Sequence, residues 1–439
     1  MNGLLGPSRL RSWIGFTALA LLPIGSVCLL SRTRLERADL AFNNGGEVST
    51  LDPHAGSGVP EGRVARALFE GLVARDLITA EPEPAAAESW TVTPDETTYT
   101  FRLREGLAWS NGEPLTAEDL EWSFRRLLEP KTAAPFAYLL DGVAGAADFS
   151  AGRSADWASV GIRALDGRTL EIRLAAATPL LEILCHWALV PVHRGSIERA
   201  QAEHPGTWQV EWLRPERLVV NGPFRLGERW VNDRLRLERN ASYWDRDNVA
   251  LDTIDVLAVE HWGTALNLYL SGAIDWLDGG LPPDLVPVLN SREDFHTFPY
   301  LGVYFYRFNV TRPPFDDVRV RRAFASAIDR DAIVRKLLFG GSQRPALCMT
   351  AADGRGYGPP QLVPASPEEC KALFEQAGYG GEDRKPFPRV AIHFNNNELH
   401  RSLAEFIAAG WTKLLGVPIG LAPQEQKMYL DAQRNLDYD

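Results

Sequence analysis

The spacing of apolar residues predicts an amphipathic helix close to residue 60. Val64, Leu68 and Leu72 recur at intervals of four, and Pro60 stands where the first helical residue is expected. The segment 49–54 precedes this pattern. We therefore expect a loop held at the N-terminus of a helix.

Short alternating segments separated by turn residues predict strands and hairpins between residues 38 and 300. Tyr99–Arg104 alternates apolar and polar residues, and the segments 162–174 and 224–237 each carry a turn sequence between two apolar runs. Thr116, followed three residues later by Asp119, predicts the capped start of a helix. Hairpins beside helices indicate mixed sheets of the α/β class.

In the last third of the chain the apolar residues mostly follow the spacing of helices. Two helices are predicted within 317–339, and a strand over 390–394 is followed by a helix over 399–415, a short strand and a helix that begins near Gln426. This order is typical of a βαβ unit. We expect the unit to lack its next partner strand.

Composition and charge narrow the classes of function. The chain has 439 residues, of which 45% are hydrophobic and 10% aromatic, as in folded globular proteins. Its formal net charge of −11 is spread along the sequence without a Lys/Arg-rich run. Nucleic acid is therefore not an expected partner, because its phosphates need a basic footprint.

The N-terminal segment is the one part that does not resemble a soluble domain. Residues 13–30 contain no charge and follow Arg9 and Arg11, as in a signal peptide or a membrane anchor. Basic residues after it favour an uncleaved anchor within residues 1–37. Cleavage with lipidation of Cys28 is the alternative.

No arrangement of residues indicates an enzyme or a metal site. Cys185, Cys348 and Cys370 lack the spacing of zinc ligands, although Cys348 and Cys370 can pair if the chain is exported. The sequences 52–54 and 260–261 contain acid and histidine pairs, but turn and strand-end roles fit them better. No cofactor is expected.

A series of motifs runs in a fixed order from residue 43 onward, and any one of them can recur by chance. They are Asn43–His54, Leu68–Leu72, Ala87–Trp90, Trp109–Leu120, Asn221–Phe224, Leu237–Asn240, Pro313–Arg322 and Ala327–Asp331. In this order and spacing they resemble the peptide-binding class of the extracellular solute-binding proteins of bacterial ABC importers, and within it the oligopeptide-binding branch.

The resemblance implies a fold that the periodicity alone only suggests. It implies a type II periplasmic-binding-protein-like α/β architecture of two lobes plus an extra domain. Lobe I would comprise 38–69 and 191–301, the extra domain 70–190, and lobe II 302–439, beginning with a strand over 303–309. The fold would be C-terminally incomplete.

The resemblance also implies a function and its contacts. The chain would capture oligopeptides between its lobes as extended strands and deliver them, as a monomer, to a membrane permease and its ATPase subunits. It would act in the periplasm or at the outer face of the cytoplasmic membrane. The peptide-binding positions would be Ser57, Gly58, Val59, Phe136, Tyr138, His400 and Gln426.

Several alternatives stay open at this point. Phe136 and Tyr138 can instead belong to the core of the extra domain, and His400 can be a solvated capping residue at a helix start. The ligand can be a nickel chelate, haem, an opine or a sugar, or the chain can be a degenerate envelope protein that transports nothing. In relatives the aspartate that pairs with the peptide ammonium would follow Asp439, so we expect weak peptide binding and an exposed sheet edge.

Overall fold

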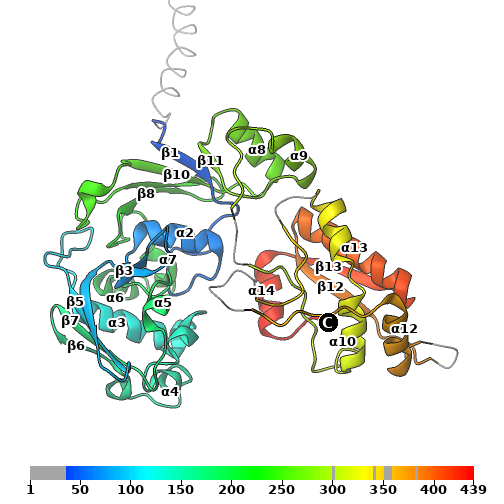
Figure 1. The fold of residues 1–439 in the computed structure, drawn as a ribbon. Helices are drawn as coiled ribbons and strands as arrows, with labels where there is room; N and C mark the ends of the chain where they lie inside the picture. Colours follow the sequence, from blue (N-terminus) through cyan, green and yellow to red (C-terminus); the bar gives the residue numbers. More distant parts are fainter. Residues whose placement is uncertain (1–35, 299–301, 340–342, 351–357, 381–383) are drawn as a thin grey trace, which may run out of the picture. The chain divides into compact units, whose positions relative to one another are not determined.

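The computed structural model describes residues 36–298, 302–339, 343–350, 358–380 and 384–439 (Figure 1). The chain forms two compact units, Met1–Gly280 and Leu281–Asp439, and each is described by itself. The second unit begins earlier than the predicted lobe boundary at 302, and that boundary stays a prediction. The predicted anchor at 13–30, with Cys28, lies outside the described residues.

The first unit contains a five-stranded mixed sheet with the order β11-β1-β10-β9-β8. Its strands are β1 (Leu40–Asn43), β8 (Phe224–Trp230), β9 (Arg234–Arg239), β10 (Thr253–Leu257) and β11 (Trp276–Leu277). β1 runs parallel to both β10 and β11, whereas β8, β9 and β10 are antiparallel. The predicted hairpin over 224–237 is confirmed as β8 and β9.

The helix predicted near residue 60 is α2 (Val59–Leu68), with a proline in its first turn. Val64 and Leu68 are buried in the same apolar core as residues of β8 and β9. Figure 1 shows α2 on one face of this sheet. The local apolar period therefore identified the helix and the buried side of Val64 and Leu68. The prediction for Leu72 is wrong, because Leu72 lies beyond the end of the helix and is buried in a different apolar core.

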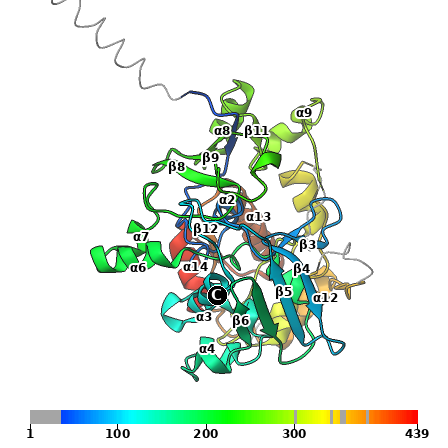
Figure 2. The same cartoon turned by 90° about the vertical axis from the view of Figure 1, so that its left-hand side faces the viewer.

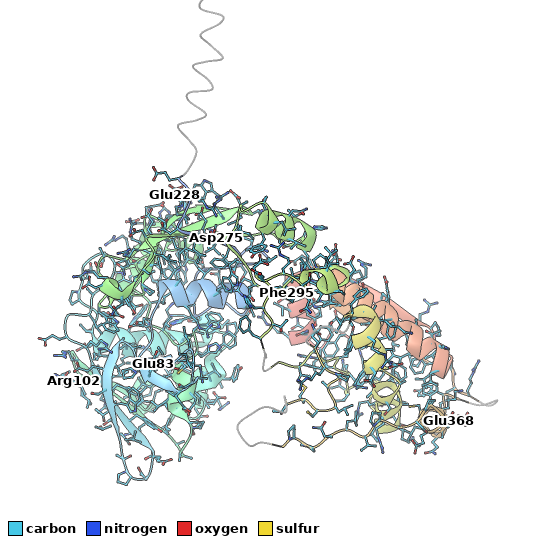
Figure 3. The ribbon with its side chains drawn as sticks, turned by 45° about the horizontal axis from the view of Figure 1, so that its top comes forward. Glu83, Arg102, Glu228, Asp275, Phe295 and Glu368 are labelled. Carbon is cyan, nitrogen blue, oxygen red and sulfur yellow. The ribbon has the colours of Figure 1, made fainter. Side chains whose placement is uncertain are left out.

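A second, antiparallel sheet has the order β4-β5-β7-β6 (Figure 2). It consists of β4 (Ala87–Val92), β5 (Thr98–Leu103), β6 (Ile162–Asp166) and β7 (Thr169–Arg173), and a separate hairpin pairs β2 (Val73–Arg75) with β3 (Pro82–Pro84). The alternation in β5 buries Phe101 and Leu103 and leaves Arg102 on the outer face (Figure 3). The predicted strand at 99–104 and hairpin at 162–174 are confirmed.

Helix α3 (Ala117–Leu128) covers this second sheet along β6 and β7. Asp119 accepts hydrogen bonds from the Thr116 backbone N–H, at 2.9 Å, and from the Thr116 hydroxyl, at 3.3 Å, so the predicted capped start is confirmed. The other helices of the unit are α4 (Ala146–Ser150), α5 (Leu180–Leu184), α6 (Arg194–Glu203), α7 (Trp208–Glu211) and α8 (Trp262–Leu270). Each of the two larger sheets has its own apolar core.

The second unit is built on the parallel pair β12 (Val390–Asn395) and β13 (Ile419–Gln424), joined by α13 (Glu398–Leu415). These are the strands and helix that the sequence predicted. The remaining helices are α9 (Val286–Leu289), α10 (Val318–Ser326), α11 (Arg330–Ala332), α12 (Pro367–Gln376) and α14 (Gln426–Arg434). The indole N–H of Trp411 in α13 donates to the Phe324 carbonyl of α10 at 2.8 Å, which fixes two helices around one core.

Two expectations for this unit are wrong. Residues 303–309 alternate as a strand does, but they form no strand, because no neighbouring strand pairs with their backbone in the described part of the chain. Cys348 and Cys370 are free thiols, and the Cys348 thiol donates instead to the Thr350 carbonyl at 2.8 Å.

The described ranges contain no group of three or more His, Cys, Asp or Glu residues placed to hold a metal ion. None of the helices in these ranges combines the length and apolarity that crossing a membrane requires.

A buried ion cluster joins the loop before α2 to α3. Arg126 binds both carboxylate oxygens of Asp52, with Nη1 at 3.1 Å and Nη2 at 2.5 Å, and its Nη1 donates to Nδ1 of His54 at 2.9 Å. Nε2 of His54 in turn donates to the Val190 carbonyl at 3.0 Å. Burial raises the pKa of Asp52, but the Arg126 charge outweighs it, so this pKa lies below its usual value.

His54 is neutral in this cluster. Burial, assisted by the Arg126 charge, lowers the pKa of His54 from 6.5 to about 4. Both ring nitrogens are used, one as acceptor and one as donor, so protonation of Nδ1 would break the bond from Arg126. The predicted turn role of residues 52–54 is confirmed by hydrogen bonds from the Ala55 and Gly56 N–H groups to the Asp52 carbonyl, but the ionic link to α3 was not foreseen.

We expect the cluster to make the stability of the first unit pH-dependent. The folded pKa of His54 lies below the unfolded value of 6.5, so unfolded chains take up the proton first, and stability falls as the pH drops from about 6.5 to 4. The loss attributable to His54 is about 3 kcal/mol. Urea unfolding at a series of pH values gives the free energy of unfolding as a function of pH. Between pH 6.5 and 4 this free energy should fall less steeply for His54→Gln than for the native chain. An unchanged pH dependence would contradict this assignment.

Candidate functional site

The predicted contact residues of the first unit lie on the loop that leads into α2. Ser57 and Val59 are exposed, and Gly58 is half-buried. The tip of this loop is therefore exposed, as peptide contact requires. A second reason explains why residue 58 is a glycine. A Cβ at this position would lie 2.2 Å from Oε2 of Glu61.

Glu61 explains why the loop keeps its path. Its buried carboxylate accepts hydrogen bonds from the Ser49 backbone N–H, at 2.7 Å, and from the Ser49 hydroxyl, at 2.8 Å. The space beside Gly58 is thus filled by a side chain that is tied to the preceding loop. The prediction that Gly58 admits a peptide backbone stays a prediction.

Phe136 belongs to a cluster of aromatic rings that packs close to this loop. Its ring centroid is 4.5 Å from that of His186 and 5.4 Å from that of Trp187, and it packs against the small core of Ala65, Trp187 and Ala188. Phe136 is half-buried and does not belong to the core of the second sheet. Tyr138, by contrast, is 60% exposed.

Trp187 connects the two predicted segments. Its indole lies over α2, where a Cβ built on Gly62 would be 2.7 Å from Nε1, and a Cβ on Gly56 would be 3.1 Å from the same ring. Burial, with the nearby Arg66 charge, lowers the pKa of His186 to about 4, so the ring beside Phe136 is neutral. The face formed by Phe136, His186 and Trp187 is aromatic and uncharged.

The second unit contains a cavity of about 410 Å³, a volume typical of ligand sites. Residues 303–308 line one side of it, β12 lines the other, and the side chains of both predicted residues, His400 and Gln426, contribute to its wall. The structure therefore brings these two predicted residues to one cavity.

Asn395, at the end of β12, connects His400 and Gln426. Its Oδ1 accepts a short hydrogen bond from Nδ1 of His400, and its Nδ2 donates to Oε1 of Gln426 at 2.7 Å. The alternative role of His400 as a helix cap is wrong, because Asn397 caps α13 through bonds from the Leu399 and His400 N–H groups.

This network leaves one acceptor and one donor for a ligand. Burial lowers the pKa of His400, which keeps the ring neutral, so Nε2 is an acceptor once Nδ1 donates. Nε2 of Gln426 is a hydrogen-bond donor. Neither this nitrogen nor Nε2 of His400 has a hydrogen-bond partner among the described residues. The Tyr304 ring, 5.5 Å from the His400 ring, closes this end of the cavity, and burial raises the pKa of its hydroxyl to about 12.

Sequence reasoning missed His186, Trp187, Asn395 and Tyr304. Asn395 stands directly after the predicted strand 390–394, where a side chain at a strand end is a reasonable site candidate. Nothing local indicates Trp187, because its partners on α2 precede it by more than a hundred residues. Gly56 and Gly62 are the only signal, since small residues mark places where another group approaches closely.

Comparison with known proteins decides the family. Residues 81–439 match the profile of the bacterial extracellular solute-binding proteins, family 5. The periplasmic oligopeptide-binding protein OppA of Escherichia coli is 35% identical over 98% of this chain and 79% of that protein. The chain belongs to family 5 of the bacterial extracellular solute-binding proteins.

Other similar proteins extend the comparison to structure and ligand. The structure of Haemophilus influenzae OppA in complex with the peptide RPPGFSPFR has a TM-score of 0.82 and 33% identity, covering 92% of this chain and 79% of that one. The probable deoxycholate-binding periplasmic protein YgiS of E. coli is 35% identical over 90% of this chain and 73% of that protein. The fold is that of the type II periplasmic binding proteins.

We expect Gly62→Ala to disturb the aromatic face. The added methyl group would meet the buried Trp187 ring, and such overpacking costs about 1–3 kcal/mol, more than the gain in helix propensity. The matched control is Gly410→Ala in α13, where a Cβ meets nothing within 4 Å. This substitution should raise the free energy of unfolding by up to about 1 kcal/mol through its higher helix propensity. Urea unfolding of both variants tests this, and equal stabilisation by the two would contradict the packing of Trp187 on α2.

Proposed function

We propose that this chain is the substrate-binding subunit of an ABC importer and captures oligopeptides outside the cytoplasmic membrane. The observation that carries the proposal is the donor and acceptor pair of Gln426 and His400 at the cavity of the second unit. A peptide backbone presents one N–H and one C=O per residue, so a neutral donor beside a neutral acceptor matches it whatever its side chains are.

The similarity to known proteins supports the same function. The relatives of this chain include an oligopeptide-binding protein, and one similar structure holds a bound nonapeptide. These relatives are binding proteins and not enzymes. The function is then capture and delivery, in which ligand binding shifts the population of a closed form that docks on a permease with its ATPases. Nickel chelates, haem, opines and sugars are not favoured by these relatives.

The domain division supports this assignment in outline. We propose lobe I at 38–69 and 191–301 and the extra domain at 70–190, on the ground that the two larger sheets of the first unit have separate cores. The predicted peptide contacts Ser57, Val59 and Phe136 then lie in lobe I and the extra domain, and His400 and Gln426 in lobe II.

Titration with RPPGFSPFR tests the peptide assignment. We expect calorimetry, with peptide up to millimolar concentration, to give saturable heat, and deoxycholate to give none and not to compete. His400→Ala and Gln426→Ala should each weaken binding by about 1 kcal/mol, roughly fivefold, because each removes one neutral hydrogen bond.

Lys413→Ala is the control, since Lys413 is exposed on α13 and does not line the cavity. It should bind as the native chain does. Saturable binding of deoxycholate with no response to peptide would exclude the oligopeptide assignment in favour of a bile-acid ligand.

We also propose that residues 13–30 hold the protein at the outer face of the membrane. The support is the uncharged apolar sequence between Arg11 and Arg32. A tether of this type would raise the effective concentration of the binding protein near its permease.

Membrane fractionation tests the tether. The full chain should stay in the membrane pellet after alkaline carbonate washing, and a chain without residues 1–37 should be released. If protein expressed from the full-length sequence is recovered in the wash and its N-terminus lies beyond residue 30, the segment is a cleaved signal peptide.

A further inference from the structure

In the described part of the chain, the cavity of the second unit is lined by a cation that has no counter-ion. Apart from two histidines, the charged side chains of this lining are Arg307 and Asp439. Both oxygens of the Asp439 carboxylate are used, because Oδ2 accepts the Ala391 N–H at 2.9 Å and Oδ1 lies 3.3 Å from Nη2 of Arg312. Arg307 has neither an ion pair nor a hydrogen bond among the described residues. The uncompensated charge of this wall is therefore positive.

Arg307 is kept on the outer side of its segment by the burial of its neighbours. Tyr306 and Phe308 pack against the apolar core of the second unit, whereas Phe305 and Arg307 are exposed. β12, on the other side of the cavity, likewise buries every second residue in that core. The guanidinium therefore lies away from the apolar core, where an unpaired charge would be strongly destabilising.

The Phe305 ring covers one face of this guanidinium. Cζ of Arg307 lies over the ring, 5.4 Å from its centroid. A guanidinium that stacks on an aromatic ring keeps its N–H groups in its own plane, where they remain free to bind a ligand. This planar fork of donors matches the two oxygens of a carboxylate. The ring also excludes water from one side of the cation, which strengthens an ion pair formed there.

We propose that Arg307 and Phe305 form a carboxylate subsite of this cavity, so that the chain prefers oligopeptides with a negative charge close to their bound backbone. This preference rests on the proposed capture of peptides and adds a charge selection to it. His400 and Gln426 bind the peptide backbone, which is common to all sequences, and Arg307 selects among the groups attached to it. The carboxylate belongs either to an Asp or Glu side chain or to the C-terminus of the peptide.

The position of Arg307 limits where this charge lies along the peptide. The Tyr304 ring contacts the His400 ring, with 5.5 Å between their centroids, and Arg307 follows Tyr304 by three residues. Three residues of polypeptide span at most about 10 Å. An extended ligand has a similar rise per residue. The carboxylate therefore lies within about three residues of the backbone group that is bound at His400.

Calorimetry with matched variants of RPPGFSPFR tests the subsite. The Gly, the Ser and each Phe of this peptide are replaced in turn by Glu or by Gln, all with amidated C-termini, and the parent peptide is compared as free acid and as amide. At low ionic strength one acidic member should bind about fivefold more tightly than its neutral match, as expected for one partly exposed ion pair. A preference within a Glu and Gln pair identifies a side chain as the source. A preference within the acid and amide pair identifies the C-terminus.

Variants of the protein show whether Arg307 causes the preference. Arg307→Gln should bind the acidic and neutral members equally, and Arg307→Lys should keep part of the preference, because the charge remains without the planar fork. The matched control is Arg335→Gln. Arg335 is also exposed, has no partner in the described part of the chain and does not line the cavity, so the full preference should remain. In the native chain the preference should weaken in 1 M salt, where the Debye length is about 3 Å.

Failure of the subsite is distinguishable from failure of peptide capture. If the peptides bind but none of the pairs shows a preference, the carboxylate subsite is overturned and peptide capture stands. A preference that persists in Arg307→Gln also overturns the subsite, since another group then provides the charge. If neither RPPGFSPFR nor any of its variants binds, peptide capture and the subsite fail together. A preference that is lost in Arg307→Gln and kept in Arg335→Gln supports the subsite.

Discussion

The second unit depends on the pairing of main-chain hydrogen-bonding groups beside β12. An unpaired N–H or C=O group is tolerated in water but costs free energy once it is enclosed by protein. β12 and β13 satisfy each other along their full lengths, and around this pair α10, α12 and α13 build one core. Within the described ranges the other edge of β12 is bonded at Ala391, whose N–H donates to the Asp439 carboxylate, and the cavity lies along this edge.

The same constraint explains why the two units differ in regularity. In the first unit each strand of the five-stranded sheet pairs within the sheet, and the loop before α2 is held by charged groups that are themselves fully bonded. A buried guanidinium is stable there because Asp52 and His54 supply acceptors at short range. The loop carrying Ser57, Gly58 and Val59 thereby has a fixed base, although its own tip is exposed.

Much of the fold could be predicted because its signals are local. The capping pair of Thr116 and Asp119, the alternation in β5 and the period of α2 each involve residues within a few positions of one another. Residues 303–309 show the limit: alternation describes a segment that fits a sheet, but a strand exists only where a neighbour completes it. Gly58 shows another limit, since a glycine marks a close approach without telling which group approaches, here Glu61.

The site was only partly predictable for the same reason. His400 and Gln426 were found through resemblance, but their use depends on Asn395, whose amide fixes which atom of each faces the cavity. A neutral histidine acceptor and an amide donor offer hydrogen bonds that carry no net charge, which is the property that the proposed capture of peptide backbones would use. The uncharged aromatic face at Phe136 has the same property, because rings without charge accept many apolar groups.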